Sequence, residues 1–376
     1  MRKLYLALAF SVFTNSALAA TKYPNVTGDY WAELSYDTVT SFSDTDPNTN
    51  DGDGKSADFY LEANPTFRLN FNKNITLQTA WLLYNPKSPT FGDDRYLDDQ
   101  GGVLEELFLK IHDEDAEFII GRIRPEFGML WDENLNTGIF GSFNGDEYLL
   151  EGKLGAGFKV KFSLEDYGNH ILSFNSFFND DTGLNDSFLS RRDTYRGDIG
   201  RAGDTSSFSS YAINLQGNNF YDVEGLFYNL SYRNVDAGSS SSGVDDEEGY
   251  ALTLGITKPF LDQLNFTPII EYAEIFNFNS TNNRFGPEFG DVNLQGDYEY
   301  LSIILALTYK NWSFNFNRLH KDFDADVNGG EDLTELSARY QFKNNLGLSL
   351  GTIDQDNSTG VERTTLAIQL DYSKNF

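Results

Sequence analysis

The sequence predicts an all-β protein, a transmembrane antiparallel up-and-down β-barrel of about 16 strands. Three observations indicate this fold class. Apolar and polar residues alternate along most of the chain, the segments between strands alternate between short and long, and the chain ends on an amphipathic strand whose last residue is aromatic. An amphipathic edge strand of a secreted β-sandwich would explain the last observation alone, but a sandwich has no reason to separate short and long loops.

The last stretch, residues 363–376, shows the alternation clearly. One face carries Thr364, Leu366, Ile368, Leu370, Tyr372, Lys374 and Phe376, and the other carries Arg363, Thr365, Ala367, Gln369, Asp371, Ser373 and Asn375. A period of two is the side-chain period of a β-strand. In a membrane barrel the apolar face contacts lipid and the polar face lines a wet lumen.

The same pattern recurs along the chain, most fully in residues 59–71, where Phe59, Leu61, Ala63, Pro65, Phe67, Leu69 and Phe71 share one face. The predicted strands are 28–40, 59–71, 75–85, 103–112, 116–124, 148–163, 170–178, 208–216, 222–235, 249–259, 265–278, 297–309, 312–321, 333–342, 346–354 and 363–376.

The connections between these strands alternate in length. The short ones are 72–74, 113–115, 165–169, 217–221, 260–264, 310–311 and 343–345. The long ones are 41–56, 86–102, 125–147, 179–207, 236–248, 279–296, 323–332 and 355–362. Outer-membrane barrels have short periplasmic turns and long extracellular loops. The pattern therefore places both termini at the periplasmic end.

The first residues are typical of a cleaved export signal. Arg2 and Lys3 precede an apolar run, and Ala17-Leu18-Ala19 supplies the small residues of a cleavage site. We therefore expect a signal peptide over residues 1–19 and a single barrel domain over residues 20–376, with no linker between domains. Removing Arg2 and Lys3 takes the net charge from −29 to −31.

Composition excludes several classes of function. The chain has no cysteine, hence no disulfide framework or zinc–thiolate site, and its acidity would repel nucleic acid. The histidines His112, His170 and His320 fall near predicted strand ends, and no Gly-x-Ser-x-Gly elbow occurs, so we expect no enzyme activity. Acids around Asp51 miss the spacing of a calcium loop. We expect no cofactor and no resident metal.

Two motifs resemble Gram-negative outer-membrane porins. In that family a terminal aromatic and the alternating residues before it, here Tyr372 and Phe376, form the signal that the barrel-insertion machinery reads. Pro125-Glu126-Phe127-Gly128 resembles the start of the constriction-loop motif of general porins, although Met129 then departs from it. The wider stretch from Gly121 is also similar to a segment of phosphate-selective porins. The resemblance implies outer-membrane localisation, contact with lipopolysaccharide, periplasmic chaperones during assembly, and a homotrimer.

A barrel of this size encloses an aqueous lumen, and we expect the third long loop to fold inward and narrow it. This loop supplies an acidic set: Glu126, Asp132, Glu133, Asp146 and Glu147. The strand registers supply a basic, hydrated wall: Lys153, Lys159, Lys161, Arg68, Lys110, Arg233 and Arg339, with Tyr148 and Leu150 facing lipid. We hypothesise a transverse field between loop and wall. The alternative is that each of these charges is merely solvated outside the narrowest point.

The ion preference of such a channel follows from competing charges. The net charge and the acids of the outer loops favour cations at the mouth, whereas the lysine row and the cluster Arg191, Arg192, Arg196 and Arg201 suit anions such as phosphate. We expect a weakly cation-selective diffusion channel for small hydrophilic solutes and ions. The alternatives are an anion- or phosphate-selective porin, or a structural or adhesive barrel that acts through its outer loops.

Overall fold

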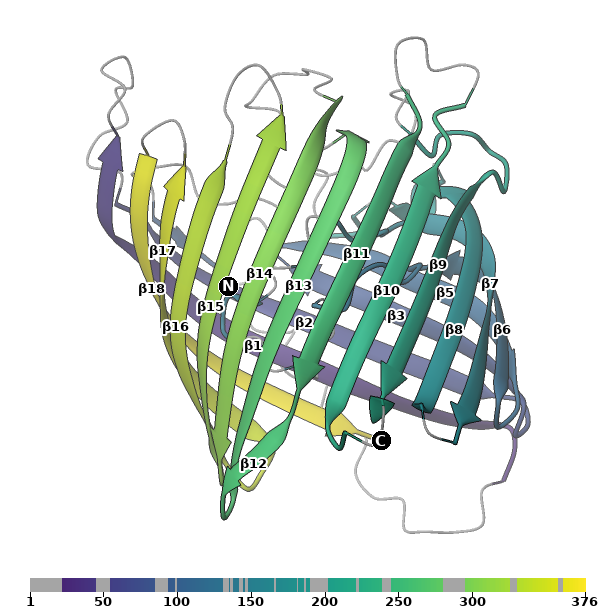
Figure 1. Ribbon diagram of the computed structural model, residues 1–376, viewed down its shortest axis with the longest axis horizontal. Coiled ribbons are helices and arrows are strands. Elements are labelled where there is room, and N and C mark those ends of the chain that lie inside the picture. The colour runs from purple at the N-terminus through teal and green to yellow at the C-terminus, as the bar shows by residue number, and fades with distance from the viewer. Residues whose placement is uncertain are drawn as a thin grey trace, which may run out of the picture.

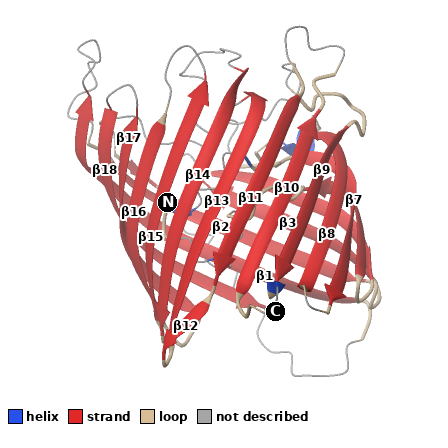
Figure 2. Cartoon of the chain, viewed as in Figure 1, coloured by secondary structure: helices blue, strands red, loops and turns tan. Residues whose placement is uncertain are grey.

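The computed structural model describes residues 22–44, 55–84, 94–98, 100–130, 135, 138–141, 145, 148–165, 167–180, 182–185, 187–189, 202–220, 223–238, 245–279, 295–324, 330–357 and 361–376. In this part of the chain nearly every residue outside the turns is in a β-strand (Figure 2). No helix among the described residues is long and apolar enough to cross a membrane.

All strands belong to one sheet that closes on itself (Figure 1). The strands are β1 (Asn25–Asp44), β2 (Ala57–Asn70), β3 (Ile75–Tyr84), β4 (Arg95–Tyr96), β5 (Gly101–His112), β6 (Ala116–Ile123), β7 (Lys153–Leu164), β8 (Gly168–Asn179), β9 (Ser210–Asn218), β10 (Leu226–Val235), β11 (Glu247–Ile256), β12 (Lys258–Leu261), β13 (Leu264–Asn279), β14 (Gln295–Tyr309), β15 (Trp312–Asp324), β16 (Glu331–Gln341), β17 (Leu346–Asn357) and β18 (Val361–Asn375).

Two of these strands are short additions to the barrel wall. The two-residue β4 pairs parallel to β2, and β12 prolongs β11 at the turn that leads to β13. The other sixteen are long, and each pairs antiparallel with its neighbours around the closed barrel. The predicted antiparallel up-and-down barrel is therefore confirmed, with strand limits that differ by a few residues from those predicted.

The barrel closes between its first and last strands. β1 and β18 pair from Asp29 opposite Asn375 to Asp44 opposite Val361. The terminal residue continues this ladder, because Gly28 and Phe376 exchange two backbone hydrogen bonds of 2.9 and 2.8 Å. The Phe376 ring packs edge-on against Phe67 of β2, with ring centroids 5.9 Å apart.

The wall has an apolar outer face and a polar inner face. β11 shows this in every residue: Glu247, Gly249, Ala251, Thr253 and Gly255 are buried inside, and their neighbours point outward. Leu252 and Leu254 are about half exposed on the outside, at 51% and 49%. Other strands, β13, β14, β17 and β18, add Ile270, Ile303, Leu305, Leu350, Leu366, Ile368 and Leu370 to this exposed apolar surface. A surface this apolar is typical of a membrane-facing protein.

Aromatic side chains gather on the outer face at the short-turn end. Trp312 lies 4.8 Å from Tyr340, which lies 4.9 Å from Phe342, all between ring centroids. Further round the barrel, the Tyr228 hydroxyl is hydrogen-bonded to His170 Nδ1 at 2.9 Å. Such a girdle suits a membrane–water interface, where aromatic rings with a polar edge are favoured.

One sequence expectation about the wall is wrong. Tyr148 and Leu150 were expected to face lipid at the start of the sixth long strand, but they are 1% and 3% exposed inside the barrel. Gly152 adopts φ +64°, a left-handed conformation that breaks the extended chain, so β7 starts only at Lys153. The period of two therefore does not extend back to Tyr148.

Candidate functional site: the lumen and its inward segment

The connection between β6 and β7, residues 124–152, is here called the inward segment. Near its start, Glu126 contacts three neighbouring strands. The Glu126 carboxylate receives hydrogen bonds from Lys159 Nζ on β7 at 2.6 Å, from Ser173 Oγ on β8 at 2.9 Å and from Gln216 Nε2 on β9 at 3.5 Å. Glu126 therefore fixes the start of the segment to the inner wall.

The next residue, Phe127, fills a site on β10. Its ring is fully buried, and the Arg233 guanidinium lies over it at 4.5 Å from the ring centroid. Arg233 also donates a hydrogen bond of 2.5 Å to the Tyr148 carbonyl and pairs with Glu247 at 2.6 Å. This cation–π contact and the two polar contacts hold both ends of the segment against one arginine.

Further along, the carboxylate of Glu271 on β13 anchors the segment. Glu271 is 1% exposed and accepts a hydrogen bond from the Met129 backbone amide at 2.7 Å. The hydroxyl groups of Tyr148 and Thr253 donate to the same carboxylate. Beside it, Leu130 packs against Ile269 and Ile304 with 2% of its surface exposed.

A second carboxylate, that of Glu335 on β16, holds the far end of the segment. It accepts hydrogen bonds from the Ile139 backbone amide at 2.7 Å and from Asn317 Nδ2 at 2.9 Å. Gly138, at φ +105°, lies so close to this carboxylate that a Cβ atom would overlap it. The described part of the segment thus follows the inner wall from β7 to β16, and the expectation that this loop folds inward agrees with these contacts.

The sequence-predicted basic residues lie on the inner face but in different surroundings. Lys159 is paired with Glu126, and Lys153 is hydrogen-bonded to Asn179 and lies 6.0 Å from the Phe177 ring. Lys161 is exposed. The other four are paired with carboxylates: Arg68 with Asp29, Lys110 with Glu117, Arg339 with Asp371, and Arg233 with Glu247.

Arg233 does not have the hydrated position that was expected for the wall. It is 1% exposed because Phe127, Phe278 and Tyr148 cover it. Of the acidic residues expected on the loop, Glu126 is placed as described above. Asp132, Glu133, Asp146 and Glu147 lie outside the described residues, as do the arginines of the fourth long loop.

An acidic wall lies half-way round the barrel from Arg233. Glu62 on β2, Glu33 on β1 and Asp371 on β18 stand side by side in register and share the inner face. Glu33 accepts hydrogen bonds from Ser35 Oγ at 3.2 Å and from Gln369 Nε2, and Asp371 pairs with Arg339 at 2.5 Å. Like charges opposite one another on adjacent strands repel, so this row favours a cation nearby.

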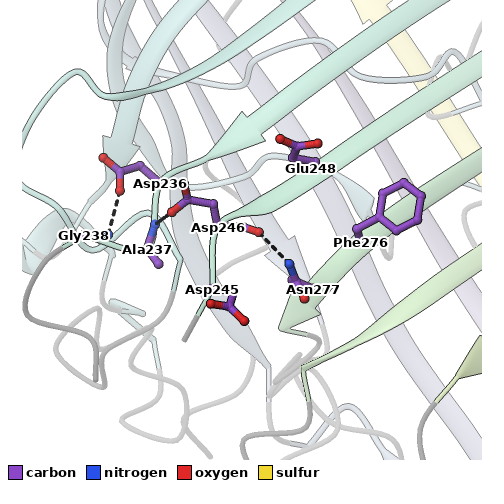
Figure 3. Close-up of a pocket in the computed structure, with 8 residues that line it drawn as sticks. All are labelled: Asp236, Ala237, Gly238, Asp245, Asp246, Glu248, Phe276 and Asn277. Atoms are coloured by element: carbon purple, nitrogen blue, oxygen red, sulfur yellow. Dashed lines mark hydrogen bonds between the residues drawn. The ribbon is translucent and has the colours of Figure 1, made fainter. Parts of the chain in front are cut away.

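A second acidic region lies at the long-loop end, in a pocket of about 630 Å³ between the ends of β10, β11 and β13 (Figure 3). Asp236 and Asp246 accept hydrogen bonds from the backbone amides of Gly238 and Ala237 at 2.7 and 2.9 Å. Asp245 and Glu248 also line this mouth pocket, in which Glu248 points to the outer side of the barrel rim. Among the described residues, no group of three or more Asp, Glu or His side chains is arranged to hold a metal ion.

Glu33, Glu62, Glu271 and Glu335 are not among the pore residues that the sequence predicts. All four fall on the polar faces of predicted strands, and the alternation places them in the lumen. Their partners come from other strands or from the inward segment, and no local pattern shows such contacts.

Comparison with known proteins supports the fold. No protein-family model and no curated protein matches the chain. Among solved structures, the chain is similar to a porin refined at 1.8 Å (11% identity, 93% of this chain and 100% of that one, TM-score 0.52) and to the outer-membrane channel DcaP of Acinetobacter baumannii (12% identity, 93% and 96%, TM-score 0.51). It is also similar to an anion-selective porin from Comamonas acidovorans (9% identity, 93% and 99%, TM-score 0.52). At these identities the likeness shows a shared barrel fold.

Proposed function

We propose that this protein is an outer-membrane porin, a passive channel through which small hydrophilic solutes and ions diffuse. The observation that carries the proposal is the closed barrel whose inner face is polar while its outer face exposes rows of apolar side chains. A lumen bounded by sixteen strands is too wide for wall side chains to fill. The inward segment supplies the narrowing, as a channel that filters by size requires.

A weak preference for cations is part of this proposal. It is supported by Glu62 and Glu33 on the inner face and by the acids of the mouth pocket, whereas Asp371 in the same row is neutralised by Arg339. Carboxylates that line a wet pore raise the local concentration of cations. In this arrangement the opposing fields lie on two walls, acids on β18, β1 and β2 and lysines on β7, and Glu126 neutralises part of the lysine row.

Anion selectivity is the second candidate. Lys153, Lys159 and Lys161 lie on the inner face of β7, and one of the similar structures is described as an anion-selective porin. Glu126 pairs with Lys159, however, which weakens this candidate.

Export and assembly follow from the same proposal. Residues 1–19 act as a cleaved signal peptide, and residues 20–376 form the single barrel domain. Tyr372 and Phe376 act as the signal for barrel insertion, the lipid partner includes lipopolysaccharide, and the protein assembles as a homotrimer. The position of Phe376, bonded to Gly28 at the seam of the barrel, supports a role late in closure.

The proposal is tested by single-channel recording in planar bilayers under a KCl gradient. We expect large conductance steps with a reversal potential on the cation side. Reversal on the anion side with block by phosphate would support the second candidate. A folded, heat-modifiable protein that gives no steps would overturn the channel and leave a structural or adhesive barrel that acts through its outer loops.

A further inference from the structure

A cavity of about 320 Å³ is recessed in the inner wall between β2 and β8, below the start of the inward segment. Its volume is at the lower end of the range for small-molecule pockets, roughly 300–1,000 Å³. Its lining contains carboxylates and cationic side chains: Glu105, Glu106, Glu117 and Glu126, and Lys110, Arg124 and Lys159. A cavity with both signs of charge is suited to a small solute that carries both signs.

The two central carboxylates are brought together by a β-bulge. The register between β3 and β5 shifts between Ala80 and Trp81, so Ala80 faces Glu106 while Trp81 faces Leu104. The extra residue, Glu105, therefore shares the inner face with Glu106, although consecutive residues of a regular strand point to opposite faces. Bulges often re-aim side chains in this way at functional sites.

Carboxamides on two other strands hold these carboxylates in place. Asn64 Nδ2 on β2 donates to Glu105 at 2.6 Å, and Gln78 Nε2 on β3 donates to Glu106 at 2.9 Å. Each hydrogen bond engages one oxygen of its carboxylate. A carboxylate has about four lone-pair sites, so both retain capacity for a further donor.

Lys110 supplies the opposite charge on the same strand. Its Nζ lies 3.5 Å from Glu117, a long ion pair compared with the 2.6 Å between Lys159 and Glu126. The Lys110 amine can therefore exchange Glu117 for a solute carboxylate at little cost, whereas Lys159 is held by a shorter ion pair with Glu126.

We propose that this cavity is a binding site for small zwitterionic amines of the α-amino acid class. Glu105 and Glu106 accept the N–H groups of the solute ammonium, and Lys110 donates to its carboxylate. The inference rests on the proposed channel function and adds a solute class to it, because a site in the lumen makes diffusion saturable for the solutes it binds.

The test measures influx of radiolabelled alanine and lactamide into proteoliposomes that contain the folded protein. These two probes are isomers, but only alanine is zwitterionic. We expect alanine influx to saturate with concentration and lactamide influx to stay linear. The double variant Glu105→Gln/Glu106→Gln is expected to raise the half-saturation concentration of alanine by about tenfold, the usual effect of losing hydrogen bonds to charged groups.

A matched control removes two charges elsewhere. Asp354→Asn/Asp356→Asn changes two exposed acids on the outer face of β17 and is expected to leave the half-saturation concentration unchanged. The Lys110→Gln variant tests recognition of the solute carboxylate separately from that of the ammonium. It should raise the half-saturation concentration of alanine but not that of alaninamide, which lacks the carboxylate.

The outcomes separate the two proposals. The proposed binding site is wrong if alanine influx is linear in the wild-type protein, or if it saturates equally in the Glu105→Gln/Glu106→Gln variant. Either result leaves the proposed channel function intact. If neither alanine nor lactamide enters, the channel itself is wrong.

Discussion

The carboxylate of Glu271 on β13 accepts a hydrogen bond from the backbone amide of Met129, 2.7 Å away on the inward segment. It also accepts hydrogen bonds from the hydroxyl groups of Tyr148 and Thr253. One buried side chain therefore links both ends of the inward segment, at Met129 and Tyr148, to the barrel wall. The inward segment is therefore held against the barrel wall by a side chain that is itself only 1% exposed.

Replacing Glu271 by alanine should loosen the inward segment. The Met129 amide and the Tyr148 hydroxyl would lose their acceptor, and each buried donor left unsatisfied costs about 1–3 kcal/mol. We expect a lower temperature for the heat-induced gel shift and a larger, noisier single-channel conductance. Glu274→Ala, on the outer face of the same strand, is the control and should change neither. A Glu271→Ala channel with wild-type conductance would contradict the anchoring role.

Gly138→Ala should disturb the second anchor. A Cβ atom at Gly138 would overlap the Glu335 carboxylate, and φ +105° is unfavourable for alanine, a cost of about 1–3 kcal/mol. We expect a lower unfolding midpoint in denaturant and altered conductance. Gly183→Ala is the matched control, because a Cβ atom there meets no atom within 4 Å. Equal midpoints for the two variants would show that Gly138 is not held against Glu335.

The sequence predicted the wall of the barrel much better than its interior. Alternation alone places Arg68 and Glu62 on the inner face of β2, because the period of two leaves no other choice once Phe59 and Leu61 face outward. The inward path of the third long loop was inferred from barrel size and resemblance. Its actual anchors, such as Glu335 with Ile139, join positions far apart in the chain and follow no period.

The bulge in β5 shows a second limit of alternation. Glu105 and Glu106 are consecutive, so a period of two assigns them to opposite faces, whereas the register shift puts both inside. Tyr148 is the reverse case, since it continues the apparent alternation of β7 but belongs to the segment that covers the wall. Both errors arise where the backbone departs from regular strand geometry.

The contact between Phe67 and Phe376 should contribute to closure of the barrel. An aromatic pair in edge-on geometry contributes about 0.5–1.5 kcal/mol beyond the area it buries. A double-mutant cycle of Phe67→Ala and Phe376→Ala, measured by denaturant unfolding in lipid vesicles, should give a coupling free energy in this range. Replacing Tyr30 instead of Phe67 supplies the comparison, because Tyr30 pairs with Tyr372 at 5.6 Å. Strict additivity of Phe67→Ala and Phe376→Ala would refute the coupling.

The turn between β5 and β6 should make stability depend on pH. Hydrogen bonds from the backbone amides of Ala116 and Asp115 lower the pKa of the Asp113 carboxyl below its ordinary value of 3.8. A pKa that is lower in the folded state means that the stabilisation is fully present above pH 3.8 and is lost as the pH falls through the folded pKa.

The measurement is the denaturant midpoint of wild type and Asp113→Ala as a function of pH. We expect a difference at neutral pH that narrows once the pH falls below 3.8. Glu114→Gln, in the same turn, should show no such narrowing. A difference for Asp113→Ala that is constant with pH would exclude these hydrogen bonds as its cause.

The three lysines of β7 should differ in their effect on ion selectivity, although all lie on the inner face. Lys161 is exposed and lines a pocket of about 530 Å³ near the short-turn end, together with Asn169 and Gln216. Lys153 is hydrogen-bonded to Asn179 beside the Phe177 ring, and Lys159 is neutralised by Glu126. Lys161→Gln should therefore move the reversal potential further to the cation side than Lys153→Gln or Lys159→Gln does.

The shift in reversal potential should shrink at high salt, where charges are screened within a few ångströms. If neutralising all three lysines together changes neither conductance nor selectivity, the basic wall has no part in the field of the pore.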